Sequence, residues 1–137
     1  MKPESNSIPS KVRDRYWIES IAPNGTWSPN SGKWLLFIAV GRIDSSWKLI
    51  DLETKSGRLG ISAKVATAKP NSLAANSRLR LICVYTYDCT DIDDVQRVRS
   101  RLRKIGFVKK TPYKTDSATR EGKYTKHGDK KIALFFE

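Results

Sequence analysis

The sequence predicts an α+β fold, with a single antiparallel sheet of about six strands and two helices packed on one face. Two helical segments, 44–57 and 90–105, each carry one apolar stripe, and such a helix buries its stripe against a single layer. Short apolar runs at 33–40 and 79–87 are typical of strands. The strands come in consecutive pairs around the helices, so we expect antiparallel pairing, which leaves the other sheet face free for a ligand.

Length and composition indicate one domain. A chain of 137 residues buries a sufficient core without disulfides or metal ions. We expect residues 1–12 to form a flexible N-terminal arm and residues 13–137 to form the domain. No apolar run approaches the roughly 18 residues of a membrane span, and the polar segment 1–10 does not resemble a signal peptide. We therefore expect a cytoplasmic protein with no membrane partner.

The first two strands are expected before residue 41. The segment 13–21 carries aromatic and branched residues and ends at the turn sequence 22–25, Ala-Pro-Asn-Gly, a pattern that favours a strand followed by a turn. A second turn-rich stretch, 28–32, precedes 33–40, whose aromatic and branched residues predict a central strand.

The first helix is predicted from its two ends and its apolar side. Asp44 is placed to accept hydrogen bonds from the free amides of the first turn, and Gly57 is placed to end the helix. Trp47, Leu49 and Ile50 form the apolar face between them.

The second helix has the clearest pattern. Thr90 is the expected N-cap, acidic residues at 91–94 complement the positive end of the helix dipole, and basic residues at 99–104 complement the negative end. Gly106 is expected to stop the helix. The core-facing stripe recurs at three and four residues and contains Ile92, Val95, Val98, Leu102 and Ile105.

Four further strands complete the expected sheet. Two are predicted near 62–67 and 79–87, with the Asn-, Ser- and Ala-rich segment 69–77 forming the longest loop between them. The last two are predicted at 107–113 and 131–136.

Several separated motifs occur in a fixed order along the chain. They are Ser31-Gly32-Lys33-Trp34-Leu35, Gly57-Arg58-Leu59, Ala63-Lys64-Val65, Ile82-Cys83-Val84-Tyr85-Thr86, Asp88, Thr90-Asp91, Tyr113-Lys114, Asp116, Thr119, Gly122 and Tyr124. Together they resemble the basophilic leukaemia expressed protein family over residues 31–124.

The resemblance implies both a fold and one activity. Family members are similar in fold to the messenger-RNA cap-binding initiation factor, with a curved antiparallel sheet and helices on its convex face, although no motif assigns a cap-stacking role to Trp27, Trp34 or Trp47. Some members are labelled as candidate phosphothreonine lyases, which use a lysine base, a histidine acid and an arginine clamp. The segment that follows Lys33 contains no histidine to serve as that acid.

Charge is concentrated in one part of the chain. Of the formal net charge of +12, +10 lies between Arg97 and Lys131. Such a field attracts phosphate-rich ligands, so RNA, DNA or a small phosphorylated molecule is the first hypothesis. The alternative is a solvated basic surface that only maintains solubility.

Lys33 and Lys64 are the first candidates for chemistry. Each lies in or beside an apolar strand segment, where a charged side chain is costly unless it reaches solvent or a partner. The two can converge on a phosphate, or alternatively both can extend from a sheet edge into solvent. We assign Lys33, Lys64 and His127, the sole histidine, as candidate catalytic residues.

The segment 113–127 mixes aromatic, hydroxyl and cationic side chains, which suits a surface that follows a phosphate backbone and stacks bases. The alternative is a mobile charged hairpin without a specific ligand. The ligand-binding candidates from this segment and from the family motifs are Arg58, Tyr85, Tyr113, Lys114, Thr119, Arg120, Lys123, Tyr124 and Lys126.

No cofactor or metal is expected. Asp88, Asp91, Asp93 and Asp94 form an acidic cluster that suits magnesium, but their place at a helix start is explained by capping. Cys83 and Cys89 match no common zinc spacing and are interpreted as structural thiols. The sequence has no glycine-rich phosphate loop and no serine nucleophile motif.

These observations favour binding of an RNA-like or nucleotide-derived phosphodiester, with metal-independent cleavage of the ribonuclease or ring-nuclease type as the preferred activity. A non-catalytic RNA- or nucleotide-binding module is the alternative, and a phosphothreonine-lyase-like enzyme is a third. The expected partners are RNA, a cyclic oligonucleotide or another phosphorylated ligand. The sequence leaves the oligomeric state open, with a homodimer among the options.

Overall fold

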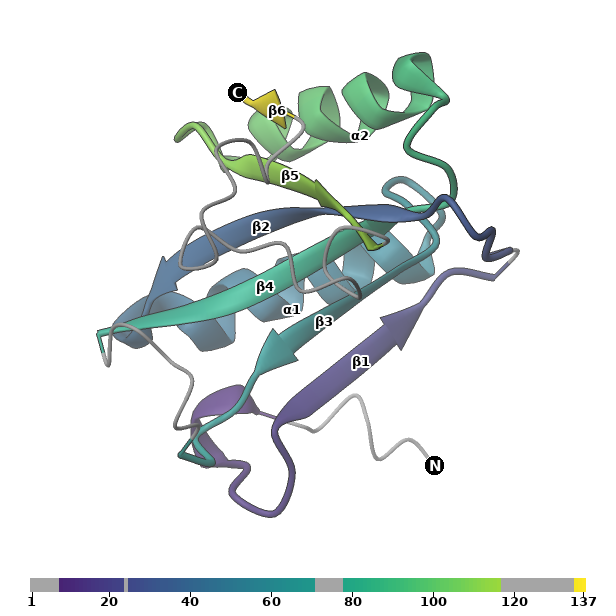
Figure 1. Cartoon of the computed structure of the whole chain (residues 1–137). Coiled ribbons are helices and arrows are strands. Elements are labelled where there is room, and N and C mark those ends of the chain that lie inside the picture. The colour runs from purple at the N-terminus through teal and green to yellow at the C-terminus, as the bar shows by residue number, and fades with distance from the viewer. Residues whose placement is uncertain (1–7, 24, 71–77, 117–134) are drawn as a thin grey trace, which may run out of the picture.

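The computed structural model describes residues 8–23, 25–70, 78–116 and 135–137. These residues form an α+β fold with one open, curved antiparallel sheet and two α-helices (Figure 1). The strand order across the sheet is β1-β3-β4-β2-β5-β6. The elements are β1 (Trp17–Ile21), β2 (Gly32–Ala39), α1 (Ile43–Lys55), β3 (Ser62–Ala66), β4 (Leu79–Thr86), α2 (Ile92–Lys104), β5 (Pro112–Thr115) and β6 (Phe135–Phe136).

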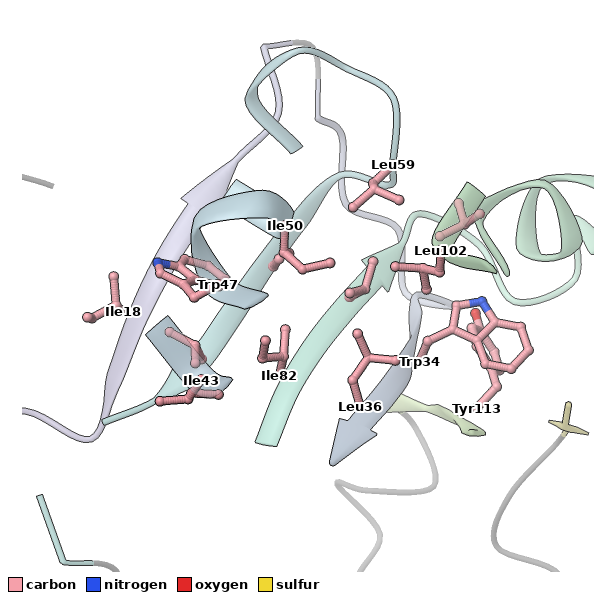
Figure 2. Packing of buried hydrophobic residues seen from close by; sticks show 14 of the residues in the cluster. Ile18, Trp34, Leu36, Ile43, Trp47, Ile50, Leu59, Ile82, Leu102 and Tyr113 are labelled. Carbon is pink, nitrogen blue, oxygen red and sulfur yellow. The ribbon is translucent and has the colours of Figure 1, made fainter. Parts of the chain in front are cut away.

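Both of these helices pack on the same face of the sheet, as predicted. Their apolar side chains join those of β1 to β5 in one core cluster (Figure 2). At the centre of the sheet the indole Nε1 of Trp34 donates a 3.1 Å hydrogen bond to the carbonyl oxygen of Val95 on α2. Because apolar burial is the main stabilising contribution, this shared cluster holds the helical layer against the strands.

The opposite side of the sheet is the outer face, to which every second strand residue points. It is defined by Trp17, Glu19, Lys33, Lys64, Cys83, Tyr85 and Lys114. In the described ranges no helix covers this face (Figure 1). None of the helices described is long and apolar enough to cross a membrane.

The start of α1 differs from the prediction. The helix begins at Ile43, and no side chain caps its first turn. The Asp44 carboxylate instead accepts hydrogen bonds from the amide and the hydroxyl of Ser10, at 2.9 and 2.6 Å. Ser10 belongs to a short 3₁₀ turn, Pro9–Lys11, that contacts α1 within the segment expected to be a flexible arm.

The start of α2 is also corrected. Asp91, and not Thr90, is the N-cap, because its carboxylate accepts a 3.2 Å hydrogen bond from the amide of Asp94. Ile92 was expected in the core stripe but is 45% exposed. The predicted stop at Gly106 is confirmed, since this residue has a φ of +116° just after the helix.

The predicted strand 107–113 is wrong at its beginning, because the described strand is β5, Pro112–Thr115. The guanidinium of Arg99 accounts for the difference. It donates to the carbonyl oxygens of Phe107 at 2.9 Å and Lys109 at 2.7 Å, so these carbonyls bond to α2 and not to a neighbouring strand.

Three further boundaries differ or stay open. The predicted strand 13–21 is confirmed only from Trp17 onward. Of the predicted strand 131–136, Phe135–Phe136 forms β6, and residues 131–134 lie outside the described residues. Most of the predicted loop 69–77 also lies outside them.

Candidate functional site

Two rows of polar side chains cross the outer face, and strand register sets their order. From the β1 side, the first row contains Glu19, Lys64 and Cys83. The second row contains Tyr85, Lys33 and Lys114. Directly opposed residues on neighbouring strands have Cβ atoms roughly 5 Å apart. The rows therefore bring three lysines together from β2, β3 and β5, which are distant in the chain.

Lys33 is buried and ion-paired. Its side chain, on β2, contacts Asp116 just after β5, with 2.8 Å between Nζ and Oδ1. Asp116 is held in turn by Ser31, whose hydroxyl donates to the carboxylate and whose carbonyl oxygen accepts from the Asp116 amide at 2.9 Å. Lys33 thus does not extend from an edge into solvent, because a carboxylate compensates its charge within the fold.

Lys64 is held by aromatic rings. Its Nζ lies 4.1 Å from the ring centroid of Trp17 and 5.9 Å from that of Tyr85. Lys33 Nζ lies 5.6 Å from the same Tyr85 ring. The two lysines therefore converge on one tyrosine, with cation–π attraction keeping Lys64 close to the sheet.

Two neutral acids lie between these cations. Burial raises the pKa of Cys83 to about 11, although Lys64 and Lys33 oppose the shift. Burial, followed by the Cys83 thiol, also raises the pKa of Tyr85. Near neutral pH both groups are protonated, so neither offers the thiolate or phenolate that nucleophilic attack requires.

Lys114 faces Lys33 across the β2–β5 pair. Burial lowers the pKa of Lys114, and the nearby Lys33 charge lowers it further. A lysine with a lowered pKa is neutral in a larger fraction of molecules and can accept a proton. This property makes Lys114 a candidate proton acceptor as well as a cation.

A small hollow of about 90 Å³ opens beside these rows, and its polar lining includes Glu19 and Lys64. Trp27 borders it, with its ring 5.2 Å from Tyr85 in an edge-to-face arrangement. Trp27 is 51% exposed, which leaves much of the ring available for stacking. This arrangement suits a planar group next to a negative charge.

Four residues that border this candidate site were not predicted from the sequence: Trp17, Glu19, Trp27 and Asp116. The alternation of Trp17 and Glu19 along one strand was a usable signal, because residues two apart share a sheet face. Trp27 lies between β1 and β2, and Asp116 follows β5. Local periodicity does not place such residues.

Tyr113 is corrected from a ligand-binding residue to a core residue. It is fully buried, and its ring packs 5.0 Å from that of Trp34. Its hydroxyl shares a 2.6 Å hydrogen bond with Thr86. Because Lys114 follows it directly, strand alternation turns Tyr113 toward the helices and Lys114 toward the outer face.

The other predicted residues fall in two groups. Arg58 pairs with Glu53 on α1 at 3.7 Å, so the structure does not place it among the outer-face lysines. The remaining candidates lie outside the described residues, and they are Thr119, Arg120, Lys123, Tyr124, Lys126 and His127.

The acidic residues around the start of α2 have local partners. Asp88 accepts hydrogen bonds from the amide and hydroxyl of Thr90 at 2.9 and 2.6 Å, and Asp94 pairs with Arg97 at 2.9 Å. The Tyr87 hydroxyl donates to Asp91, which raises the pKa of Tyr87 to about 12. Within residues 8–116, apart from the undescribed positions, no cluster of three or more acidic, His or Cys side chains is placed to hold a metal ion.

The protein-family model described as basophilic leukemia-expressed protein Bles03 matches residues 24–120 of this chain. This match covers more than half of the chain and spans β2 to β5, including Lys33, Lys64 and Lys114. The motif-based prediction is thereby confirmed, and the chain belongs to the basophilic leukemia-expressed protein Bles03 family.

Proposed function

We propose that this protein binds an RNA-like or nucleotide-derived phosphodiester on its outer face, in the cytoplasm. The observation that carries the proposal is the convergence of Lys33 and Lys64 on the Tyr85 ring, with Trp17 and Trp27 alongside. Recognition of a single strand has two components. Cations follow the phosphate backbone, and aromatic rings stack on the bases. The formal net charge of +12 adds long-range attraction for such a ligand.

The proposal extends to metal-independent cleavage. A ribose phosphodiester supplies its own nucleophile, the 2′-hydroxyl, so the protein needs only to move protons and stabilise charge. The ammonium groups of Lys33 and Lys64 suit charge stabilisation, and His127 is the proposed general acid for the leaving oxygen. Lys33 and Lys114, which are opposed across β2 and β5, favour cleavage of the ligand over binding alone.

Binding is tested by fluorescence anisotropy with a labelled short RNA and a labelled cyclic oligoadenylate. Lys64→Met keeps the apolar stem beside Trp17 but removes the charge. Loss of one charge-assisted phosphate contact costs about 1.5 kcal/mol, so Kd should rise roughly tenfold. Lys48→Met, at an exposed position of α1 in the other layer, is the matched control and should bind as the wild type does. Equal affinity of the two variants would refute an outer-face site.

Cleavage is tested by incubating both ligands with the protein in EDTA and measuring product mass. We expect cleavage to persist and to yield a cyclic phosphate end. Tight binding with uncut ligand would favour the non-catalytic module, and EDTA-sensitive cleavage would contradict the metal-independent mechanism. A phosphothreonine peptide in a parallel reaction tests the lyase alternative, which predicts loss of phosphate by elimination.

A further inference from the structure

The small hollow on the outer face brings together polar and aromatic side chains from separate parts of the chain. Its lining includes Glu19 of β1, Ser62 and Lys64 of β3, Tyr85 of β4, and Trp27 from the connection between β1 and β2. Strand register places Glu19 opposite Lys64, and Ser62 opposite Tyr85. Because residues two apart on one strand share a sheet face, Ser62 and Lys64 both lie on the outer face.

Ser62 is the buried polar residue of this hollow. It is only 5% exposed, and no hydrogen bond joins its hydroxyl to another described residue. Among the described residues, the side-chain oxygen that is both fully buried and without a partner is that of Thr54, so the Ser62 hydroxyl keeps access through the hollow. A hydroxyl at such a position gains from a hydrogen-bonding ligand, because buried polar groups are costly without a partner.

Glu19 adds two further acceptor atoms. It is exposed, and no hydrogen bond or ion pair joins its carboxylate to another described residue. Lys64 lies directly opposite in the register, but its Nζ is held 4.1 Å from the ring centroid of Trp17. The ammonium group that is best placed to pair with Glu19 thus lies over an aromatic ring, and the carboxylate is available to donors on a ligand.

Trp27 supplies a surface for stacking. It is 51% exposed, and its ring lies edge-to-face against Tyr85. The hollow holds about 90 Å³, less than the roughly 300 Å³ of a small ligand pocket. It therefore takes one edge of a planar group whose face rests on Trp27. Proteins read single-stranded bases in this way, by stacking on an aromatic ring and by hydrogen bonds to the Watson–Crick edge.

We propose that the hollow is a guanine-selective subsite of the outer-face ligand site, an assignment that rests on the proposed function. Guanine is the RNA base with two adjacent donors on its Watson–Crick edge, N1–H and the 2-amino group, beside the O6 acceptor. The Glu19 carboxylate accepts from the two donors, and the Ser62 hydroxyl donates to O6. Adenine would place the lone pair of its N1 against the carboxylate, and this repulsion disfavours it.

The assignment narrows the ligand to an RNA-like phosphodiester that contains guanine. Binding is measured by fluorescence anisotropy with labelled uridine hexamers that carry one central guanosine, inosine or adenosine. The guanosine hexamer should bind most tightly. Inosine lacks only the 2-amino group, so its Kd should be roughly tenfold higher, the effect of one charge-assisted hydrogen bond.

Glu19→Gln is the informative variant, because it keeps the size of the side chain and removes its charge. A glutamine amide accepts from the 6-amino group of adenine and donates to a ring nitrogen, so the preference should move from the guanosine to the adenosine hexamer. Asp93→Asn, at an exposed position of α2 in the helical layer, makes the same change in net charge and should keep the preference for guanosine.

Ser62→Ala tests the second polar contact. Guanosine and inosine both carry O6, so both hexamers should bind roughly fivefold more weakly, the effect of one neutral hydrogen bond. The all-uridine hexamer should bind to this variant as it binds to the wild type. Unfolding midpoints of the variants establish that a loss of affinity is not caused by misfolding.

The outcomes separate the subsite from the proposed function. Equal affinity of the wild type for the guanosine and adenosine hexamers, or an unchanged preference in Glu19→Gln, would overturn the guanine assignment, while binding of RNA would still support the proposed function. Absence of binding to every hexamer at low salt would overturn both.

Discussion

At the scale of single residues, two buried charges organise this fold. Arg99 is only 1% exposed, and its guanidinium donates to the carbonyl oxygens of Phe107, Lys109 and Glu137 while packing against Trp34. Glu53 on α1 accepts two hydrogen bonds from Arg101 on α2, at 2.7 and 3.1 Å. Such groups are tolerated in the interior because every charge meets a polar partner.

Glu53→Gln is predicted to destabilise the protein in a pH-dependent way. The hydrogen bond from Arg101 lowers the pKa of Glu53 below its ordinary value of 4.5. The ionised form is therefore the stabilising one, so its contribution is present above pH 4.5 and is lost as the pH falls through the lowered pKa. Since charge-assisted hydrogen bonds contribute about 2 kcal/mol, urea unfolding at pH 7 should show a loss of this order.

The same difference should shrink at acid pH, once the pH has fallen through the lowered pKa of Glu53 and the wild-type carboxylate is protonated. Asp51→Asn is the control, because among the described residues the ion pair of Asp51 is with the exposed Lys55 of α1, and surface pairs contribute about 0.5 kcal/mol or less. A gap between Glu53→Gln and the wild type that stays the same from pH 7 down through the whole acid range in which the protein is folded would contradict the assigned role of the Arg101 contact.

At the scale of elements, a close contact between two backbone segments fixes how the segment after α1 meets strand β4. A Cβ atom at Gly60 would overlap the carbonyl oxygen of Tyr85 on β4. The amide of Ile61 donates to that same oxygen at 3.1 Å, which ties the segment after α1 to the strand that carries Tyr85. This contact therefore supports both the fold and the position of a proposed ligand-binding side chain.

Gly60→Ala is predicted to destabilise the protein by about 2 kcal/mol, because backbone must shift to accommodate the methyl group. The displaced Tyr85 should also weaken RNA binding. Gly41→Ala is the matched control, since a Cβ there meets no atom within 4 Å. Thermal unfolding and anisotropy titrations measure the two effects, and an equal response of both variants would argue against the close approach.

At the scale of the whole molecule, charge is distributed unevenly along the chain. The helical layer carries compensated pairs such as Arg101–Glu53 and Arg97–Asp94, whereas the outer face collects lysines from three strands. Under the proposed function, a phosphate-bearing ligand is attracted by the formal net charge of +12 on the chain, so its affinity should depend on ionic strength.

Affinity for a short RNA is predicted to fall linearly with salt on logarithmic axes. Each lost phosphate contact should reduce the magnitude of this log–log slope by about 0.7 for a single-stranded RNA. Charge reversal at Lys123 and Lys126, which lie outside the described residues, should weaken binding more than reversal at Lys48 and Lys55 of α1. Salt-independent binding, or equal effects of the two pairs of reversals, would contradict the electrostatic hypothesis.

Much of the fold followed from local patterns. Apolar spacing of three and four residues located both predicted helices, and short branched runs located β2, β3 and β4 to within a few residues. These features are determined by sequence because side-chain periodicity reports directly on which face is buried. The ordered family motifs likewise identified the Bles03 family, and they contain the three outer-face lysines.

Contacts between distant residues were decided only by the tertiary structure. Asp44 bonds to Ser10, 34 positions away, instead of capping its own helix, and Lys33 pairs with Asp116 across 83 positions. Arg99 takes the carbonyls that a longer strand would have used. Local sequence predicts only which side chains share a face, whereas sheet order determines which charges become neighbours. For that reason the opposition of Lys33 and Lys114 emerged only when β5 was found beside β2.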